Sequence, residues 1–290
     1  MRYFVSAADD ATATDYEALL DDHGYTVLDE YDDDAIVLSV GGDGSILYNS
    51  RRYAEPTILP VAGRGSEANR IDVNERGLLD RLADLEDGRE GLDYWVETHR
   101  KLVATRDGEA IGEGFTGLND VHLHHANPVR AAKFAIRVLD RPNDGIEVET
   151  DGDGDSDDSD DSDDALAAES RAANDADYER TVYEADRVIG DGLLVTTPFG
   201  STGYYRSISG GVIHTGIAVA FNNVHKPADA PRSISLSPAG RVDLEVLTTT
   251  RSTSAVLARD DDTDVHRLTP GDPISVSLSD RAVEILRFDG

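Results

Sequence analysis

The stretch that decides the fold is Ala35-Ile36-Val37-Leu38-Ser39-Val40-Gly41-Gly42-Asp43-Gly44-Ser45-Ile46-Leu47. An apolar run of strand length leads into Gly-Gly-Asp-Gly, and a helix-like pattern follows, which predicts a strand, a tight turn and a helix start. Glycine lets the backbone approach an anion, and the first turn of a helix offers unpaired N–H groups. Gly41, Gly42, Gly44 and Ser45 are therefore candidate phosphate-binding residues.

The carboxylate of Asp43 lies in the middle of this turn. A phosphate would repel a bare carboxylate, so in a phosphate site Asp43 would carry a metal, accept a proton or bind a sugar hydroxyl. The alternative is that Asp43 only caps the following helix. The stretch alone favours neither interpretation over the other.

The rest of the N-terminal part alternates strand and helix patterns. Met1 to Ala8 predicts a strand, Thr14-x-x-Glu17 predicts the start of a helix, and Pro56 to Ala62 is another apolar run of strand length. This alternation predicts a parallel sheet with helices on its faces, and ligands bind at the carboxyl ends of such strands.

Beyond about residue 95 the pattern changes to short β-prone segments separated by turn signals. This pattern is typical of an antiparallel β-sandwich. The sequence therefore predicts an α/β domain over 1–95 and a β domain over 96–290, with a ligand-binding cleft between them. We also expect the extreme C-terminus to return to the first domain.

One segment has a very different composition. Residues 147–164 include 11 acidic residues and no basic residue. Their spacing imitates a calcium loop, but the bidentate glutamate and the flanking helix patterns are missing, so disorder is the better interpretation. We expect an acidic disordered insertion over about 147–177, within a hairpin.

The whole chain is strongly acidic, with a net charge of −31 over 290 residues. It has only three lysines, and this composition resembles that of proteins from salt-loving organisms. Such a charge argues against a nucleic-acid partner. The absence of cysteine excludes disulfides and zinc–thiolate sites. No apolar run reaches membrane-spanning length and the N-terminus lacks a signal-peptide pattern, so we expect a cytoplasmic protein without membrane contact.

Two further stretches carry candidate binding residues. Asn119-Asp120 can bind vicinal hydroxyls or simply make a turn. The run from Asp191 to Ser207 leads from a strand into a turn rich in small hydroxyl residues, where Ser201 can be a plain N-cap. His122, His124 and His125 are interpreted as packed or surface groups rather than metal ligands, because no third ligand has a defined position. We therefore predict no metal-binding side-chain cluster.

Together these stretches resemble the NAD kinase family, within the superfamily that also holds diacylglycerol and sphingosine kinases. The resemblance rests on Gly-Gly-Asp-Gly-Ser at 41–45, Asn119-Asp120, the run Asp-Gly-Leu-x-Val-x-Thr-Pro-x-Gly-Ser-Thr-x-Tyr at 191–204, and Gly-Gly-Val-Ile-His at 210–214. It implies an NAD kinase-like fold, in which a Rossmann-like α/β domain precedes a β-sandwich. It also implies phosphoryl transfer from ATP, with Mg²⁺ or another divalent cation, to the adenosine 2′-hydroxyl of NAD, in a homodimer or homotetramer.

The resemblance also implies roles for single residues. Asp43 would orient or deprotonate the attacking hydroxyl, and the glycines beside it would admit phosphate oxygens. The dinucleotide would be bound by Asn119, Asp120, Asp191, Thr202, Tyr204, Ser207 and His214. Phosphoryl transfer depends on positioning and electrostatics, so no covalent nucleophile is required.

Several positions depart from the family pattern. Val61 to Asn69 lacks the usual Asn-x-Gly-x-Leu-Gly-Phe-Leu stretch, Ile189 replaces an arginine, and Gly203 replaces an alanine. Phe221 to Pro227 is more polar than the family pattern. Two alternatives therefore stay open, namely a kinase that acts on another hydroxyl compound such as a sugar or nucleoside, and a nucleotide-binding protein without activity. The sequence does not distinguish ATP from polyphosphate as donor.

Overall fold

The fold was analysed in a computed structural model, which describes residues 1–63, 73–74, 76–87, 94–127, 129–141, 180–247 and 254–288. The acidic segment 147–177 and residues 64–69 of the departing stretch lie outside these residues. The elements, in chain order, are β1 (Arg2–Ala7), α1 (Asp10–Asp22), β2 (Thr26–Val27), β3 (Ile36–Gly41), α2 (Asp43–Arg52), β4 (Thr57–Ala62), β5 (Val73–Asn74), α3 (Leu78–Asp87), β6 (Tyr94–Arg106), β7 (Glu109–Gly117), β8 (Asp120–His125), β9 (Ala132–Asp140), β10 (Arg180–Gly190), β11 (Gly192–Thr196), η1 (Gly200–Thr202), α5 (Tyr204–Ser209), β12 (Ile217–Asn222), β13 (Ser233–Leu236), β14 (Arg241–Val246), β15 (Ala255–Arg259), β16 (His266–Leu268) and β17 (Pro273–Phe288).

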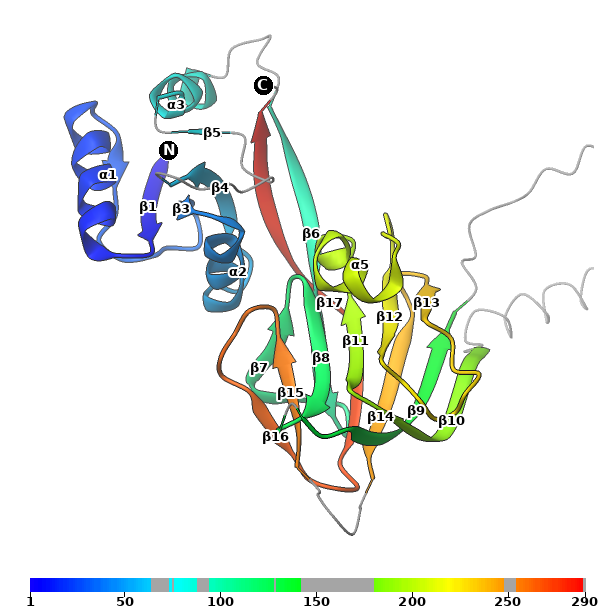
Figure 1. Ribbon diagram of the computed structural model, residues 1–290. Helices are drawn as coiled ribbons and strands as arrows, with labels where there is room; N and C mark the ends of the chain where they lie inside the picture. The colour runs from blue at the N-terminus through cyan, green and yellow to red at the C-terminus, as the bar shows by residue number, and fades with distance from the viewer. Residues whose placement is uncertain are drawn as a thin grey trace, which may run out of the picture.

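The molecule has two lobes joined by a long ribbon of β6 and β17 (Figure 1). The first lobe contains the parallel strands β1, β3 and β4 with α1, α2 and α3, and the second contains two antiparallel sheets. The fold class predicted from the sequence, an α/β part followed by a β-sandwich part, is confirmed. The boundary near residue 95 stays a prediction.

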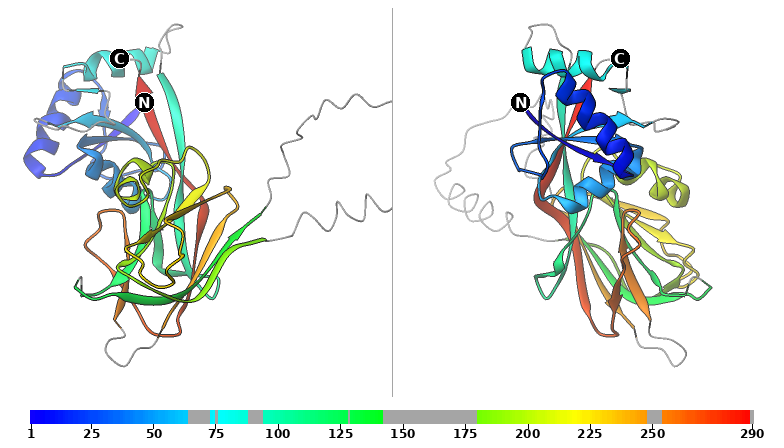
Figure 2. Two further views of the ribbon diagram at one scale, coloured as in Figure 1. Left: turned by 45° about the vertical axis from the view of Figure 1, so that its right-hand side comes forward. Right: turned by 90° about the vertical axis from the view of Figure 1, so that its left-hand side faces the viewer.

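A single sheet runs through both lobes, in the order β10-β9-β14-β17-β4-β3-β1-β2. It is continuous because β17 pairs antiparallel with β14 near its start and parallel with β4 at Glu284 and Ile285. The C-terminal strand thus extends the parallel sheet of the first lobe, as both orientations in Figure 2 show. A second sheet has the order β13-β12-β11-β8-β15-β16. It packs against the part of the first sheet that lies in the second lobe.

Three apolar clusters hold these layers together. One fills the space between the two sheets of the second lobe, around Phe134, and another lies beneath α1 and α3, around Leu59. The third joins the lobes, because Ile46 of α2 packs with Leu118 and Phe199 of the second lobe. Burying each large aliphatic side chain contributes about 1.5–3 kcal/mol, so the apolar contacts between the lobes are substantial.

The helix start predicted at Thr14 is wrong. Helix α1 begins at Asp10, and its N-cap is Asp9, whose carboxylate accepts a hydrogen bond from the backbone N–H of Thr12 at 2.9 Å. Thr14 lies inside the helix, where its hydroxyl donates to the carbonyl oxygen of Asp10. An aspartate at the N-cap competes well with a threonine, so the earlier residue starts the helix.

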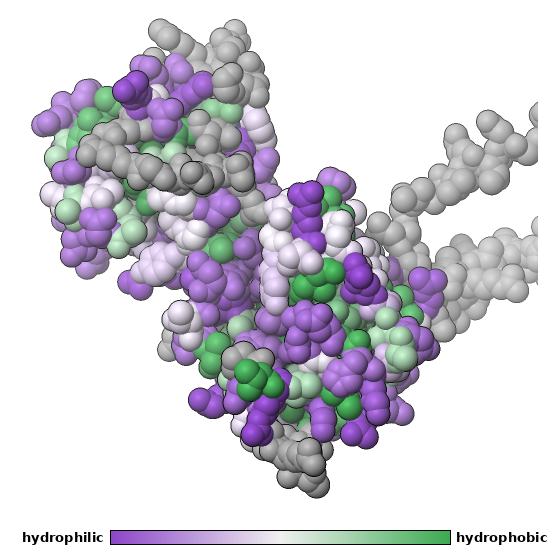
Figure 3. All heavy atoms as spheres, in the orientation of Figure 1, coloured by the Kyte–Doolittle hydropathy of each residue, from purple (hydrophilic) through white to green (hydrophobic). Residues whose placement is uncertain are grey.

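Hydrophilic residues cover much of the face drawn in Figure 3, and hydrophobic residues form small separate patches. None of the helices in the described part of the chain has the length and the apolar composition needed to cross a bilayer.

Candidate active site

The first lobe has the topology that creates a ligand site between two strands. β1 leads through α1 to β2 on one side, whereas β3 leads through α2 to β4 on the other. The chain therefore changes direction between β1 and β3, and a crevice opens at the carboxyl ends of these strands. A cavity of about 700 Å³ lies there, lined by Phe4, Val5, Ser6, Ala7, Ala8, Asp9, Asp10, Ala13, Gly41, Gly42, Gly44, Ser45, Tyr48, Arg52 and Tyr53.

The glycine turn has the geometry that the sequence predicts. Gly41 ends β3 with φ +156°, and its carbonyl oxygen accepts the backbone N–H of Gly63 at 3.0 Å. A Cβ atom on Gly63 would lie 3.3 Å from the Cα atom of Gly41, so these two backbones need the close approach that glycine permits. The hydroxyl of Ser45 donates to the carbonyl oxygen of Gly42 at 2.7 Å, which keeps the turn tight.

Asp43 does not cap the helix. The N-cap of α2 is Gly42, which makes no side-chain capping bond, and Asp43 is the first helical residue. Its Oδ1 atom is buried and has no hydrogen-bond partner among the described residues. The N-terminus of α2 therefore presents uncapped N–H groups together with an unsatisfied carboxylate oxygen. Such a pair suits a phosphate ligand and a cation or proton that accompanies it.

Asn119 and Asp120 lie on the second lobe, where β8 begins. The backbone carbonyl of Asn119 accepts the backbone N–H of Thr197 at 3.0 Å and the hydroxyl of Thr196 at 2.9 Å, so the backbone of this pair is fixed by the end of β11. The Oδ1 atom of Asn119 is buried without a hydrogen-bond partner among the described residues. This amide oxygen is therefore available to a ligand donor.

The carboxyl of Asp120 is nearly buried, with 7% of the residue exposed. Burial and then the nearby carboxylates of Asp260 and Asp261 raise the pKa of Asp120 to about 8. The group therefore keeps its proton at neutral pH and can donate a hydrogen bond as well as accept one. A protonated carboxyl of this kind suits a ligand hydroxyl better than a ligand phosphate.

The turn after β11 positions three of the predicted residues near one another. Thr202 ends η1, and Tyr204 and Ser207 lie on α5, where the hydroxyl of Ser207 donates to the carbonyl oxygen of Tyr204 at 2.7 Å. The Tyr204 ring is 45% exposed, and its hydroxyl accepts a hydrogen bond from the side-chain amide of Asn222 at 2.9 Å.

Ser201 is not an N-cap. It is buried, and its hydroxyl is hydrogen-bonded to the carbonyl oxygens of Pro198 at 2.9 Å and Ile213 at 3.1 Å. The second of these bonds ties the segment that precedes His214 to the turn, although the side chain of His214 itself is exposed.

Asp191 lies apart from Asn119 and Asp120. It precedes β11, whereas Asp120 pairs with Thr196 at the other end of that strand. Five residues of extended strand span about 17 Å, so one small group cannot contact both carboxyls. The Asp191 carboxylate is exposed and accepts the side-chain amide of Asn223 at 2.7 Å. A single ligand that reached both ends of β11 would have to be long.

Sequence reasoning missed the acidic turn Asp260-Asp261-Asp262, which contacts both lobes. It also missed Lys101 of β6, whose ammonium donates hydrogen bonds to the carbonyl oxygens of Ser50, Tyr53 and Ala54 at the C-terminal end of α2. A cation at this end of a helix is favourable, so Lys101 fixes the helix that carries Asp43. The only sequence signal for the acidic turn was three successive carboxylates directly after an apolar strand.

His122 and His124 face the same side of β8, with ring centroids 4.8 Å apart. Burial and then the neighbouring His124 lower the pKa of His122 to about 4, and the Tyr204 ring packs edge-on against it. His122 is therefore neutral at physiological pH. Within the described residues, no group of three or more His, Asp or Glu side chains is arranged to hold a metal ion.

Known proteins resemble this chain in both sequence and fold. Residues 174–288 match the ATP-NAD kinase C-terminal domain family. The NAD kinase of Pseudomonas savastanoi pv. phaseolicola is 28% identical over 256 residues, which cover 87% of this chain and 70% of that protein. The NAD kinase of Pseudomonas entomophila is 31% identical over 183 residues, or 62% of this chain and 46% of that protein.

The chain is thus similar to NAD kinases over most of its length. Its fold also matches those of two solved structures. The NAD kinase from Archaeoglobus fulgidus in complex with ATP has a TM-score of 0.63 and 16% identity, over 100% of this chain and 94% of that one. Yeast NADH kinase complexed with NADH has a TM-score of 0.70 and 12% identity, over 100% of this chain and 84% of that one. The similarity in fold thus includes both lobes of the described structure.

Proposed function

We propose that this protein is an NAD kinase, which transfers the terminal phosphoryl group of ATP to the adenosine 2′-hydroxyl of NAD and makes NADP. The similarity to NAD kinases supports this activity, and so do the names of these relatives. The observation that carries the proposal is the uncapped N-terminus of α2, where Asp43 has an unpartnered oxygen and its neighbours Gly42 and Gly44 line a cavity of about 700 Å³.

In the proposed reaction, the 2′-oxygen of NAD forms a bond to the terminal phosphorus of ATP. The bond between that phosphorus and the oxygen that bridges to the next phosphate breaks, and ADP leaves. The Asp43 carboxylate orients the 2′-hydroxyl and accepts its proton, since its Oδ1 atom has no other described partner. The N–H groups at the start of α2 stabilise the negative charge on the transferred phosphoryl group.

The residues at this turn fit a divalent cation such as Mg²⁺. Mg²⁺ in kinases is bound through one or two carboxylates together with the phosphates of the substrate, and it neutralises phosphate charge. Asp43 supplies one carboxylate with a free oxygen, and ATP would supply the phosphates. We expect Asp43 to hold this cation.

The dinucleotide would lie along the second lobe. Asn119 and the protonated Asp120 suit hydroxyls near the reacting centre, and Tyr204 offers an exposed ring on which a base can stack. Asp191 would contact the distant nicotinamide half, because it lies at the far end of β11. Ser207, Thr202 and His214 would line the pocket between these points.

The test is an assay of purified protein in molar KCl with ATP, MgCl₂ and NAD. NADP is measured with an NADP-specific dehydrogenase, and polyphosphate replaces ATP in a second series. We expect NADP to form in proportion to enzyme and to depend on Mg²⁺. Consumption of ATP with sugars or nucleosides but not with NAD contradicts the proposed acceptor. Tight NAD binding without consumption of ATP or polyphosphate contradicts catalysis.

We also propose that the protein acts in the cytoplasm as a homodimer or homotetramer. The prediction is one or the other mass in size-exclusion chromatography coupled to light scattering in molar salt. A monomeric mass at micromolar concentration contradicts it.

A further inference from the structure

The acidic turn Asp260–Asp262, which follows β15, holds the loop that carries Asn119. The Asp260 side chain is completely buried, and its carboxylate accepts the backbone N–H groups of Asn119 at 2.7 Å, Leu118 at 3.2 Å and Asp120 at 3.3 Å. The backbone N–H of Asp260 donates in return to the carbonyl oxygen of Asp120 at 3.0 Å. Four hydrogen bonds thus fix the two segments to each other.

The backbone around Asp260 is unusually constrained. Asp260 has φ +48°, in the left-handed region that non-glycine residues rarely adopt. A Cβ atom on Gly117 would lie 2.5 Å from the carbonyl oxygen of Asp120 and 3.3 Å from Oδ1 of Asp260. Successive N–H groups that converge on one carboxylate form an anion-binding nest, and here the anion is part of the chain. The turn after β15 and the segment before β8 therefore both have constrained backbones around this carboxylate.

Arg51 connects the same turn to α2. Its Nη1 atom lies 2.7 Å from Oδ1 of Asp261 and 3.6 Å from Oδ2 of Asp260, and its Nε atom lies 3.6 Å from Oδ2 of Asp262. Only 14% of the Arg51 side chain is exposed, and its partner Asp260 is completely buried, whereas Asp261 is 54% exposed. The arginine thus contacts all three acids of the turn.

Arg51 lies eight residues after Asp43 on α2, which is just over two turns along the helix. Gly44 also lies close to the acidic turn, because a Cβ atom on Gly44 would come within 3.1 Å of Oδ2 of Asp261. Helix α2, which carries Asp43, thus lies close to the acidic turn Asp260–Asp262 at both its N-terminal and its C-terminal end.

We propose that Asp260 and Arg51 form a positioning clamp, which holds the Asn119 loop of the second lobe in register with the Asp43 end of α2. This inference rests on the NAD kinase activity proposed above. Two of the unpartnered buried oxygens, Oδ1 of Asp43 and Oδ1 of Asn119, lie on the two segments that the clamp joins. The clamp sets the placement of the acceptor hydroxyl relative to the donor phosphate.

The hydrogen bonds distinguish a positioning role for Arg51 from a general contribution to the stability of the fold. The Asp260 carboxylate already accepts three backbone N–H groups from its own lobe, so its burial does not depend on Arg51. Helix α2 is also held by Lys101 and by the apolar cluster around Ile46. Loss of Arg51 should therefore leave the fold intact and loosen the register between the lobes.

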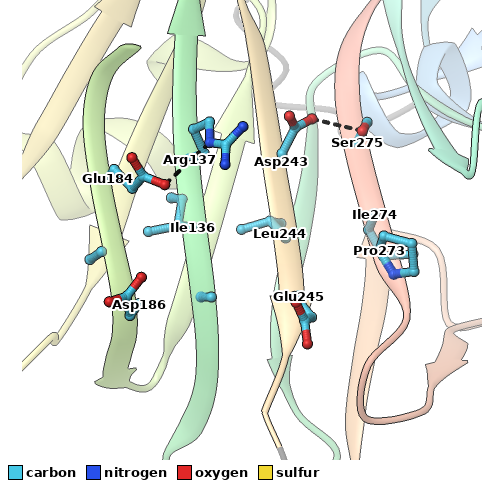
Figure 4. Close-up of a pocket in the computed structure, with 12 residues that line it drawn as sticks. Ile136, Arg137, Glu184, Asp186, Asp243, Leu244, Glu245, Pro273, Ile274 and Ser275 are labelled. Carbon is cyan, nitrogen blue, oxygen red and sulfur yellow. Dashed lines mark hydrogen bonds and ion pairs between the residues drawn. The ribbon is translucent and has the colours of Figure 1, made fainter.

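The kinetic test compares Arg51→Gln, Arg51→Lys and a control, Arg137→Gln. Arg137 makes an ion pair with Glu184 at 3.3 Å on the outer face of the large sheet, in a pocket formed by β9, β10, β14 and β17 (Figure 4). Displacement of reacting groups by about 1 Å costs about 100-fold in rate, so we expect a kcat loss of this order in Arg51→Gln. Because Arg51→Gln also leaves the buried Asp260 without its cation, kcat is compared per folded protein, and Arg51→Lys should recover part of kcat.

Wild-type kcat in Arg51→Gln overturns the clamp. A kcat loss that follows only from a lower folded fraction overturns it too, as does an Arg51→Lys variant no better than Arg51→Gln.

A second measurement does not require activity. Hydrogen exchange of the full-length protein, followed by mass spectrometry, reports the N–H groups of Leu118 to Asp120. We expect faster exchange there in Asp260→Asn and in Arg51→Gln than in Arg137→Gln. Unchanged exchange in both variants overturns the clamp. If the wild type makes no NADP, the proposed function fails, and the exchange result still decides whether the clamp exists.

Discussion

Gly200 lies directly against Asn119, since a Cβ atom on Gly200 would come within 2.2 Å of the Asn119 carbonyl oxygen. That oxygen also accepts hydrogen bonds from Thr196 and Thr197, so it cannot move without breaking them. The glycine of the second predicted binding turn is therefore in contact with the polar pair on β8. Two motifs whose contacting residues are 81 positions apart in the sequence form one surface.

Replacement of this glycine should damage the site. In Gly200→Ala the new methyl group displaces the backbone of Asn119, so we expect destabilisation of about 1–3 kcal/mol, as for overpacked interiors, and a strong loss of NADP formation. Gly211→Ala is the control, because the nearest atom to its Cβ would be 4.0 Å away. Urea unfolding and the NADP assay measure the two effects. Equal behaviour of the two variants would show that the contact with Asn119 is unimportant.

Asp43→Asn should abolish phosphoryl transfer and preserve the fold. The amide has nearly the same shape as the carboxylate, but it neither accepts the proton of the hydroxyl nor binds a cation well. We expect kcat to fall by about 10²–10⁴-fold, the range usual for loss of a general base, with little change in the unfolding midpoint. Near-normal turnover would remove Asp43 from the mechanism.

Asp120 should make stability depend on pH. Because its pKa is raised to about 8 in the folded protein, the folded state binds its proton more tightly than the unfolded state does. The stabilisation from this proton is fully present below about pH 4 and is lost as pH rises through about 8.

Asp120→Asn should remove that dependence. We expect the unfolding free energy of the variant, relative to wild type, to increase between pH 5 and pH 8. Urea titrations at several pH values in constant KCl measure this difference. Parallel pH profiles for the two proteins would contradict the raised pKa.

Lys101→Met should destabilise the protein, although Lys101 is not one of the proposed ligand-binding residues. The substitution leaves three carbonyl oxygens at the end of α2 without their donor, and an unsatisfied buried group costs about 1–3 kcal/mol. Lys226→Met is the matched control, since Lys226 is exposed. The comparison is made by urea unfolding in molar KCl, and equal midpoints would contradict a structural role for Lys101.

The surface charge should make folding depend on salt. With a net charge of −31, repulsion between carboxylates opposes the compact state until salt screens it. We expect the native circular dichroism spectrum and NADP formation only in molar KCl, with an unfolding temperature that rises with salt. A fully native spectrum and full activity in dilute buffer would contradict this.

The sequence by itself determined the strand, the turn and the helix around Gly41 to Ser45, because apolar periodicity and glycine act locally. It also determined the resemblance to NAD kinases, because Asn119-Asp120 and the 191–204 run keep that family's residues and order. It did not determine the cap of α2, since Gly42 and Asp43 are both acceptable N-caps and only the folded structure distinguishes them.

Tertiary structure alone decided which distant groups meet. The contact of Gly200 with Asn119, the hydrogen bonds from Lys101 to the end of α2, and the burial of Asp260 beneath Asn119 all join segments far apart in the chain. The raised pKa of Asp120 likewise depends on burial and on carboxylates more than 100 residues away. Local patterns cannot encode such pairings, because they arise only when β8 pairs with β11 and β15 in the second lobe, and when β17 and the cluster around Ile46 bring the two lobes together.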